Sequence, residues 1–550
     1  MIRRSAERLP TAWLAPWPNA GYASPVSENL GAALERAARL DGGAEAVVEG
    51  DTRWTYGELR GRVASFDAAL DDLGLAQGDV VAVLALNSAA HLVTWLAVPR
   101  SGRVLNDLNF RLAPAELEFI LGDSGARVLI VDDMFLDAGR KLAGACESVE
   151  HLVYAGSAPA TPDGSLSFEG LCTSGAGAAP ARVDPDAIAG IFYTGGTTGL
   201  PKGAMLTHRN LVHNAKHALI HLGYTEDDSY LHAAPMFHLA DGASTYALTW
   251  VGGRHVIQQA FEPAAWMRLV AQEKVTRALL VPTMITMVLN HPEIGDHDLG
   301  SVNTMLYGAS PMPAEVLKQG LETLSCGWIQ AYGMTEAAPL LTFLSAKDHV
   351  VGMAGDERLA RRLRSAGRPA VGCEVEVRRA DGVTVCDVDE PGEVYARGPN
   401  IMKGYWNRDE ETAHALVEGW YRSGDAATMD ADGYVYIVDR VKDMIISGGE
   451  NIYCTEVENA VYRHAAVLEC AVFGIPDERW GEAVHAVVVL KDGAHAEAAE
   501  IIDFCRPLIA GFKLPRSVEF VDALPKSGAG KILKKDLREP HWTGHERRVS

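Results

Sequence analysis

The segment Ile191–Asn210, IFYTGGTTGLPKGAMLTHRN, decides most of what this chain can be. An apolar run of the β type (Ile191–Tyr193) leads into six residues that hold three glycines and three threonines, and a helical pattern follows from about Asn210. Glycines let the backbone approach an oxyanion with its N–H groups pointing inward. Threonine hydroxyls add donors, and Lys202 supplies a charge for the β and γ phosphates of a nucleotide. The segment therefore predicts a phosphate-binding loop, although its composition alone also fits a flexible surface loop with a solvated lysine.

This loop is not that of a P-loop NTPase. A Walker loop carries glycine before its lysine and serine or threonine after it, whereas Lys202 stands between a proline and a glycine. A second segment, Ser527–Lys531 (SGAGK), resembles a Walker loop only superficially. There Pro525 occupies the place of the first glycine, and Ile532 the place of the serine or threonine. Neither segment supports a P-loop NTPase.

Short apolar runs alternate with helical patterns along most of the chain. Val80–Leu86 (VVAVLAL) is continuously apolar between turn residues, which predicts a buried strand, and a helix is expected from Ser88 to near Pro99. Further runs of this kind are Val128–Val131, Ala278–Val281 and Met305–Tyr307. This alternation predicts an α/β protein with largely parallel sheets.

The sequence predicts two places where the chain passes from one domain or subdomain to the next. Between Ser157 and Pro180 the composition shifts to Gly, Ala, Ser, Thr and Pro, which favours a loop or subdomain joint over packed structure. A second joint is expected near Asp439–Lys442, and it divides the chain into domains of residues 1–439 and 440–550. The smaller part has an α+β pattern, with helices expected at Thr455–Arg463 and Glu497–Cys505 and strands at Val467–Phe473 and Ala483–Leu490.

Composition limits the partners and the compartment. Fifty Lys+Arg against 72 Asp+Glu leave a net charge of −22, so we expect no nucleic-acid binding and repulsion from anionic bilayers. We find no signal peptide and no apolar stretch of the roughly 20 residues that a membrane span needs. The eight cysteines lack the paired spacing of a zinc site, which favours a reduced, cytoplasmic protein. The oligomeric state is left open, with a homodimer as one option.

The loop Tyr193–Gly203 closely resembles the signature loop of the adenylate-forming superfamily: acyl-CoA synthetases, 4-coumarate-type ligases, luciferases and peptide-synthetase adenylation domains. The likeness continues in order through Pro235–His238 (PMFH), Gly308–Pro311 (GASP), Tyr332–Glu336 (YGMTE), Tyr421–Asp425 (YRSGD), Asp439–Asn451 (DRVKDMIISGGEN) and Pro525–Lys531 (PKSGAGK). The resemblance implies a large N-terminal domain of α/β sheets with a distorted β-barrel subdomain, followed by a small, mobile α+β domain.

The reaction that this resemblance implies has two halves. A carboxylate attacks the α-phosphorus of ATP in the presence of Mg²⁺, giving acyl-AMP and pyrophosphate. The thiol of coenzyme A then displaces AMP. Because the first half brings two anions together, the site must neutralise charge without admitting water.

On the nucleotide side, the resemblance assigns a role to each motif. Thr335 would touch phosphate, Glu336 would coordinate Mg²⁺, Asp425 would accept the ribose hydroxyls, and Arg440 would bind ribose or phosphate. Lys531 would bridge the carboxylate and the α-phosphate during adenylation. The phosphate loop would use Thr194, Gly195, Gly196, Thr197, Thr198, Gly199 and Lys202, and the adenine slot would consist of the loop Gly308–Pro311 (with Ala309 and Ser310) and Tyr332. Gly333 would also line the nucleotide site.

The acyl and CoA sides follow from the same resemblance. His238 would be a gate near the carboxylate, and Lys442 the hinge that swings the small domain. The acyl pocket would comprise His238, Ala240, Ser244, Tyr307, Gly333, Pro339 and Leu340, whose mostly small or apolar side chains suggest a hydrophobic acid, aryl or aliphatic. Gly448 and Gly449 would admit the pantetheine thiol, and Trp480 would stack on the CoA nucleotide or simply be a packed surface aromatic.

Two positions depart from the family's commonest pattern. Gly195 replaces a serine of the phosphate loop, and Cys454 replaces the proline that usually follows Asn-Ile-Tyr. Three interpretations stay open: an acid–CoA ligase for a hydrophobic monocarboxylate, an adenylating enzyme with another acceptor (an amine, a carrier protein, or nitrite in diazotisation), and a non-catalytic adenylate-binding protein. The intact residues Lys531, Glu336, Asp425 and Arg440 disfavour the last.

Overall fold

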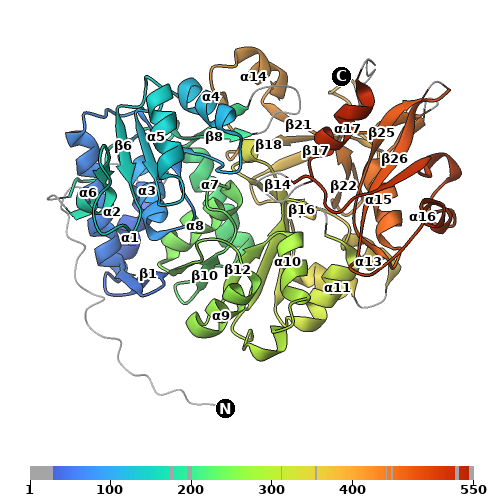
Figure 1. Ribbon diagram of the computed structural model, residues 1–550, viewed down its shortest axis with the longest axis horizontal. Helices are drawn as coiled ribbons and strands as arrows, with labels where there is room; N and C mark the ends of the chain where they lie inside the picture. The colour runs from blue at the N-terminus through green and yellow to red at the C-terminus, as the bar shows by residue number, and fades with distance from the viewer. Residues whose placement is uncertain are drawn as a thin grey trace.

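The computed structural model describes residues 29–173, 177–194, 201–310, 312–353, 356–440, 443–447, 450–477, 479–526 and 532–543, with the backbone alone at Arg440, Glu450 and Asn451. Within them a large N-terminal part carries three sheets and a small C-terminal part carries a fourth (Figure 1). The α/β class expected from the sequence is confirmed.

One sheet of the large domain has eight strands. Its order is β19 (Gly404–Tyr405), β9 (Lys202–Thr207), β8 (Ile188–Thr194), β4 (Val104–Asp107), β3 (Val80–Leu84), β5 (Val128–Val131), β6 (His151–Tyr154) and β7 (Leu166–Ser167). The strands from β8 to β7 run parallel, while β9 and β19 are antiparallel additions at one edge. Every residue of β3, β4 and β5 is buried, and for β3 and β5 this burial explains why their sequences are continuously apolar.

The second sheet has nine strands. Its order is β16 (Arg368–Pro369), β15 (Leu340–Leu344), β14 (Gly327–Gly333), β13 (Thr304–Gly308), β12 (Arg277–Leu280), β10 (Ser229–His232), β11 (Arg254–Ile257), β1 (Glu45–Glu49) and β2 (Thr52–Thr55). The central strands are parallel, and antiparallel strands close both edges.

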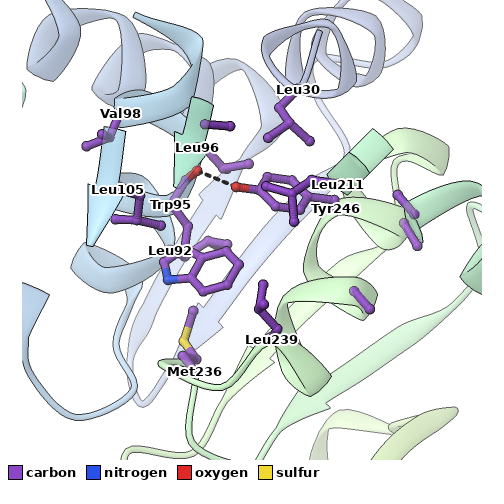
Figure 2. Packing of buried hydrophobic residues seen from close by; sticks show 14 of the residues in the cluster. Leu30, Leu92, Trp95, Leu96, Val98, Leu105, Leu211, Met236, Leu239 and Tyr246 are labelled. Carbon is purple, nitrogen blue, oxygen red and sulfur yellow. Dashed lines mark hydrogen bonds between the residues drawn. The ribbon is translucent and has the colours of Figure 1, made fainter. Parts of the chain in front are cut away.

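Helices pack between these two sheets and form the largest core. They are α1 (Gly31–Leu40), α2 (Tyr56–Asp72), α3 (Ala89–Arg100), α7 (His208–Leu222) and α8 (Leu239–Val251). Figure 2 shows Trp95 of α3 facing Tyr246 of α8, whose hydroxyl donates to the Trp95 carbonyl at 3.0 Å. Ser88 caps α3 through the His91 N–H, as its position before the helix predicts.

The other α-helices of the described part of the large domain, apart from α6 (Phe168–Thr173), complete its layers. They are α4 (Pro114–Ser124), α5 (Leu136–Ala145), α9 (Pro263–Glu273), α10 (Pro282–Leu289), α11 (Ala314–Thr323), α12 (Ala346–Gly352), α13 (Glu357–Arg362) and α14 (Asp409–Ala415). None of the helices in the described ranges is long and apolar enough to cross a membrane.

The expectation of an unpacked joint between Ser157 and Pro180 is wrong. This segment contains β7 and the helix α6 (Phe168–Thr173), and the Phe168 ring packs against Phe66 of α2 with 4.7 Å between centroids. Phe168 and Cys172, four residues apart, are both buried. With only these two residues buried and Leu171 partly buried, the apolar face of α6 is too short to stand out among small and polar neighbours.

The third sheet of the large domain is antiparallel. Its strands are β17 (Glu374–Arg378), β18 (Gly392–Arg397), β21 (Trp420–Met429), β20 (Leu416–Val417) and β22 (Val435–Arg440). Its core includes Val375, Val394 and Ala427.

The small domain has its own core and is drawn in orange to red in Figure 1. It comprises β23 (Ile445–Ser447), β24 (Glu450–Ile452), α15 (Cys454–Tyr462), β25 (Val467–Asp477), β26 (Gly481–Leu490), α16 (Ala498–Cys505), β27 (Ser517–Phe520) and α17 (Lys534–Trp542). The two helices and two strands expected here are confirmed. Asp439 and Arg440, the first two residues of the expected joint, are the last two residues of β22, and all eight cysteines of the chain are free.

Candidate active site

The two ends of the predicted phosphate loop meet in a hairpin of β8 and β9. Thr194 and Lys202 are cross-strand partners, and the Thr194 hydroxyl donates to the Lys202 carbonyl at 3.4 Å. The hairpin therefore presents a threonine hydroxyl and a lysine at the mouth of the loop. The predicted loop residues Gly195, Gly196, Thr197, Thr198 and Gly199 lie outside the described residues.

Tyr405 connects this hairpin to the predicted metal-binding carboxylate. Its hydroxyl donates to Glu336 Oε1 at 2.8 Å, and Lys202 Nζ lies 5.7 Å from the centre of its ring. Tyr405 is held there because β19 pairs with β9, where it faces Ala204. Sequence reasoning missed this residue; the aromatic cluster in Met402–Asn407 (MKGYWN) is the signal that could have drawn attention to it.

Hydrogen bonds fix the turn that carries Thr335 and Glu336. This turn is a short 3-10 helix, Thr335–Ala337, and the Glu336 side chain is buried with 8% of its residue exposed. The fully buried Asn400 donates to the carbonyls of Ala337 at 2.8 Å and Leu340 at 3.0 Å. The Met402 N–H donates to the Glu336 carbonyl at 2.8 Å. The carboxylate is therefore held in place by its backbone and by Tyr405.

Tyr332 and Asp425, predicted as parts of the adenine and ribose sites, are in direct contact. The Tyr332 hydroxyl donates to Asp425 Oδ2 at 2.6 Å, and Asp425 is 4% exposed. A hydrogen bond to a buried ionised carboxylate is stronger than one between neutral groups. Asp425 also faces Arg440 across β21 and β22, so the backbone places the predicted ribose carboxylate and arginine opposite each other.

Glycine is required at two positions of the predicted nucleotide site. A Cβ at Gly308 would lie 2.3 Å from the Ala331 carbonyl oxygen, and one at Gly333 would lie 1.7 Å from the Pro339 carbonyl oxygen. Neither side-chain atom could be accommodated without moving backbone. Ala309 follows with φ of +66°, a left-handed conformation that is rare for residues other than glycine, and Ser310 continues this bend. Non-glycine residues in this region are enriched at ligand-binding turns.

The predicted acyl-pocket residues come mainly from the start of α8 and the start of β15. His238 precedes α8, Ala240 lies in its first turn, and Ser244 is fully buried and accepts from the Tyr224 hydroxyl at 2.9 Å. Pro339 and Leu340 are buried, and the Leu340 N–H donates to Asn214 Oδ1 at 3.0 Å.

The imidazole of His238 is neutral at ordinary pH. Burial lowers its pKa to about 4, and the nearby positive charge of Arg111 acts in the same direction. A neutral imidazole beside the Phe237 ring, 5.1 Å away between centroids, gives the acyl side a weakly polar character.

The structure does not bring Tyr307 together with the other acyl-pocket residues. Its fully buried ring packs on Trp328, and its hydroxyl bonds with His349 Nε2 at 2.8 Å. It belongs to a different hydrophobic cluster from Leu340 and Ala240, so its placement gives no support to an acyl-pocket role.

In the small domain the described residues flank the predicted functional ones. Lys442, Gly448, Gly449 and Lys531 lie outside the described ranges. On either side of residues 527–531, Lys526 and Ile532 form an antiparallel bridge. Lys526 also pairs with Glu469 at 2.5 Å, and Lys534 with Glu458 at 2.8 Å, so both flanks are anchored to the domain.

Trp480, the predicted CoA-stacking residue, is 40% exposed, and the Arg479 guanidinium lies 4.6 Å from its ring centre. An exposed aromatic under a cation is compatible with nucleotide stacking.

Cys454, one of the two departures from the family pattern, links the small domain to the joint. Its buried thiol donates to the Asp443 carbonyl at 3.1 Å, and its N–H donates to Asp439 Oδ2 at 2.5 Å. A proline has no N–H and could not make the second bond.

Comparison of the chain with known proteins identifies its family. The chain matches the family described as AMP-binding enzyme over residues 34–406 and the AMP-binding enzyme C-terminal domain over residues 456–531. It is 41% identical to a feruloyl-CoA synthase of Amycolatopsis sp over 522 residues, covering 93% of this chain and 99% of the relative. It is 34% identical over 513 residues to the medium/long-chain-fatty-acid–CoA ligase FadD8 of Mycobacterium tuberculosis, covering 91% and 88%.

Among solved structures, the anthranilate CoA ligase AuaEII in complex with anthranoyl-AMP superposes with a TM-score of 0.84. It is 27% identical, and the match covers 93% of this chain and 97% of that one. The family match spans well over half of the chain, and the relatives match nearly end to end. The chain therefore belongs to the AMP-binding enzyme family of the adenylate-forming superfamily, and it is an ATP-dependent, AMP-forming acyl-CoA synthetase.

Proposed function

We propose that this enzyme, which joins a hydrophobic carboxylate to coenzyme A at the expense of ATP, prefers an aryl acid of the hydroxycinnamate class. The observation that carries the ligase function is the convergence at Tyr405, which donates a hydrogen bond to the buried carboxylate of Glu336 and has Lys202 Nζ of the phosphate hairpin 5.7 Å from its ring centre. The aryl preference is supported by the 41% identity to a feruloyl-CoA synthase, against 34% to a fatty-acid ligase.

In the first half-reaction, positively charged side chains within the site would offset the negative charges of ATP and of the attacking carboxylate. The chain as a whole carries a charge of −22, so ATP and a carboxylate must be attracted by groups within the site. Lys202 is the first residue of β9 in the phosphate hairpin, and Arg440 faces Asp425 across β21 and β22. With Lys531 added, three cations would surround the nucleotide phosphates and the incoming carboxylate, stabilising the charge that gathers on them during attack.

The residues present also fit Mg²⁺. Glu336 is a buried carboxylate next to the Thr335 hydroxyl, and hard oxygen donors of this kind, together with phosphate oxygens, are the ligands that Mg²⁺ prefers. We propose that Glu336 holds the ion with the ATP phosphates. When bound, Mg²⁺ would neutralise phosphate charge, and Tyr405 would orient the carboxylate that holds it.

The acyl side selects for an apolar acid. A neutral His238 beside Phe237, a small Ala240 and a buried Leu340 offer little to a charged or strongly polar tail. The acid carboxylate would therefore be directed toward the cations on the nucleotide side, while its hydrophobic part lies along the start of α8.

We propose that the two halves of the reaction use two orientations of the small domain. The boundary lies between residues 439 and 440, with Lys442 as the hinge. In one orientation Lys531 reaches the carboxylate and the α-phosphate; in the other, Gly448 and Gly449 admit the pantetheine thiol and Trp480 stacks on the CoA nucleotide. A few residues that absorb a large change in φ and ψ suffice for such a movement.

An acceptor other than CoA is not favoured, because the relatives that match the chain over its length are named mainly as CoA ligases. A homodimer and a cytoplasmic location remain predictions, which size-exclusion chromatography with light scattering and cell fractionation would test.

The function is tested by two assays on the same acid panel. ATP–pyrophosphate exchange is measured with ferulate, coumarate, fatty acids of several lengths, and nitrite, and AMP release is then measured with and without CoA. We expect exchange and CoA-dependent thioester formation with hydrophobic acids, and the highest kcat/KM with the hydroxycinnamates. Higher kcat/KM with fatty acids would refute the aryl preference alone, whereas exchange without thioester would point to another acceptor.

A further inference from the structure

Three metal-ligating side chains meet in the small domain, among residues that the ligase reaction does not use. They are His485 on β26, Glu519 on β27 and His541 on α17. One ligand atom from each lies within 4.8 Å of the other two. Two imidazoles and one carboxylate form a donor set that zinc uses in proteins, while Mg²⁺ and Ca²⁺ prefer oxygen ligands.

His485 is already oriented as a metal ligand would be. It is 5% exposed, and its Nδ1 lies 2.7 Å from Ser517 Oγ. When Nδ1–H donates to the serine, the lone pair of Nε2 points to the other side of the ring. Metal-bound histidines are held in one tautomer by such a bond from the second nitrogen.

The Nε2 atom of His485 has no hydrogen-bond partner among the described residues, although it is buried. Glu519 Oε2 lies 3.6 Å from it, which is too far for a hydrogen bond. Leaving a buried polar atom unpaired costs free energy, and such atoms in native proteins usually have a water or an ion as partner. A metal ion bound next to this nitrogen would supply the partner that it lacks.

Strand pairing and the contacts of α17 bring the three groups together. His485 faces Ser517 across the parallel strands β26 and β27, and Glu519, two residues further, projects from the same face. The helix that carries His541 is fixed by Trp542, whose Nε1 donates to the Gly474 carbonyl at 2.9 Å, and by packing of the His541 ring on Phe473, 5.8 Å between centroids. Figure 1 shows α17 lying against the β25–β26 hairpin.

We propose that His485, Glu519 and His541 bind one divalent transition-metal ion, zinc being the best fit, and leave a fourth position for water or an anion. Three protein ligands with one open position are a common zinc arrangement. The ion would fasten α17 to the sheet. Because α17 begins at Lys534, three residues after Lys531, the metal would also fix the C-terminal anchor of the segment that carries the predicted adenylating lysine.

Cobalt(II) provides a direct test with the full-length protein, after chelator treatment and without ATP. We expect one equivalent of Co²⁺ to bind with the visible d–d absorption of a low-coordinate site, and Zn²⁺ to displace it. Replacing the orienting residue, Ser517→Ala, is expected to weaken binding by roughly 10–100-fold. H485Q, H541Q and E519Q should each weaken it at least as much.

Two controls locate the ion. His495→Gln changes an exposed histidine of the same domain and should leave the affinity unchanged. Glu336→Gln alters the proposed Mg²⁺ site and should also leave Co²⁺ binding unchanged. In hydrogen exchange, Zn²⁺ should increase protection of the α17 amides in the wild type and in H495Q, but not in H541Q.

The proposal is overturned if the wild type binds neither Co²⁺ nor Zn²⁺, or if H541Q, which alters a partly exposed side chain and should fold, binds them as tightly as the wild type. It is equally overturned if E336Q, rather than the histidine variants, abolishes binding. Circular dichroism of each variant separates loss of a ligand from loss of the fold.

Discussion

The nucleotide side and the acyl side of this active site are built differently. On the nucleotide side, the predicted polar groups are tied together by hydrogen bonds, as in the pairs Tyr332–Asp425 and Tyr405–Glu336. On the acyl side, small or apolar residues surround a neutral His238. ATP is the same in every reaction of this family, so its contacts can be fixed in advance. The acid differs among members, and a hydrophobic pocket distinguishes acids mainly by shape.

The largest effect is expected from Lys531→Ala, because this lysine is proposed to serve both sides at once. Removing the cation that bridges the carboxylate and the α-phosphate should slow adenylation by roughly 10²–10³-fold. Thioester formation from supplied acyl-AMP should be largely retained. Pyrophosphate exchange measures the first step, and AMP release from synthetic acyl-AMP and CoA measures the second. Equal loss of both steps would contradict the assigned role.

A smaller effect, confined to the nucleotide side, is expected from Tyr332→Phe. The substitution removes a donor from the buried Asp425, and a hydrogen bond to a charged group is worth about 1.5–3 kcal/mol. We expect KM for ATP to rise by roughly tenfold or more, with KM for the acid unchanged.

Tyr436→Phe is a matched control for that experiment. Tyr436 also donates to an aspartate, Asp430, at 2.9 Å, but this pair lies outside the predicted site residues. Its loss should leave both KM values unchanged. If Tyr332→Phe and Tyr436→Phe have the same KM for ATP, the Tyr332–Asp425 pair has only a structural role. Its hydrogen bond would then not be a contact that fixes the position of ATP.

The elements of the fold differ in how clearly the sequence predicts them. Buried parallel strands leave a local signal, and Val128–Val131 was predicted to the residue because every side chain in it is buried. The helix α3 was predicted because Ser88 caps it. The helix α6 was missed because it is six residues long and only two of them are buried. Local signals therefore identify elements whose burial is continuous or whose ends are capped.

Long-range pairing limits the prediction of the site. Glu336 and Asp425 lie in motifs that can be recognised within a few residues. Tyr405 was missed because its role depends on β19 joining the edge of β9, which lies far away in the sequence. The cluster of His485, Glu519 and His541 was missed for the same reason, since its members come from three separate elements.

Tyr405→Phe tests that missed residue and should have a moderate effect. Without the bond from its hydroxyl, the Glu336 carboxylate is less well oriented toward Mg²⁺. Loss of an outer-shell partner typically weakens metal affinity by 10–100-fold, and we expect a change near the lower end, about tenfold, because phosphate oxygens would share the ion. The measurement is the Mg²⁺ concentration at half-maximal pyrophosphate exchange. An unchanged Mg²⁺ requirement together with an altered KM for the acid would move Tyr405 to the acyl side.

The smallest effect is expected from protonation of His238 on the acyl side, which changes the pH dependence of stability. The folded pKa of His238 is about 4, below its ordinary value of 6.5, because burial disfavours the charged imidazole. The unfolded chain therefore binds more protons between these two values, so this group's contribution to stability is complete above pH 6.5 and declines as the pH falls toward about 4. His208 and His217, whose pKa values burial also lowers to about 4, act in the same direction.

Activity should accordingly show no inflection near pH 6.5 that depends on His238. We expect the kcat/KM profiles for the acid of the wild type and of His238→Gln to run parallel from about pH 5 to about pH 8. The denaturation midpoint of His238→Gln should fall less steeply with acidification, since one histidine fewer takes up a proton when the chain unfolds. An inflection near pH 6.5 that disappears in His238→Gln would mean that the imidazole is charged when the acid binds, and the acyl side would then be electrostatic, like the nucleotide side.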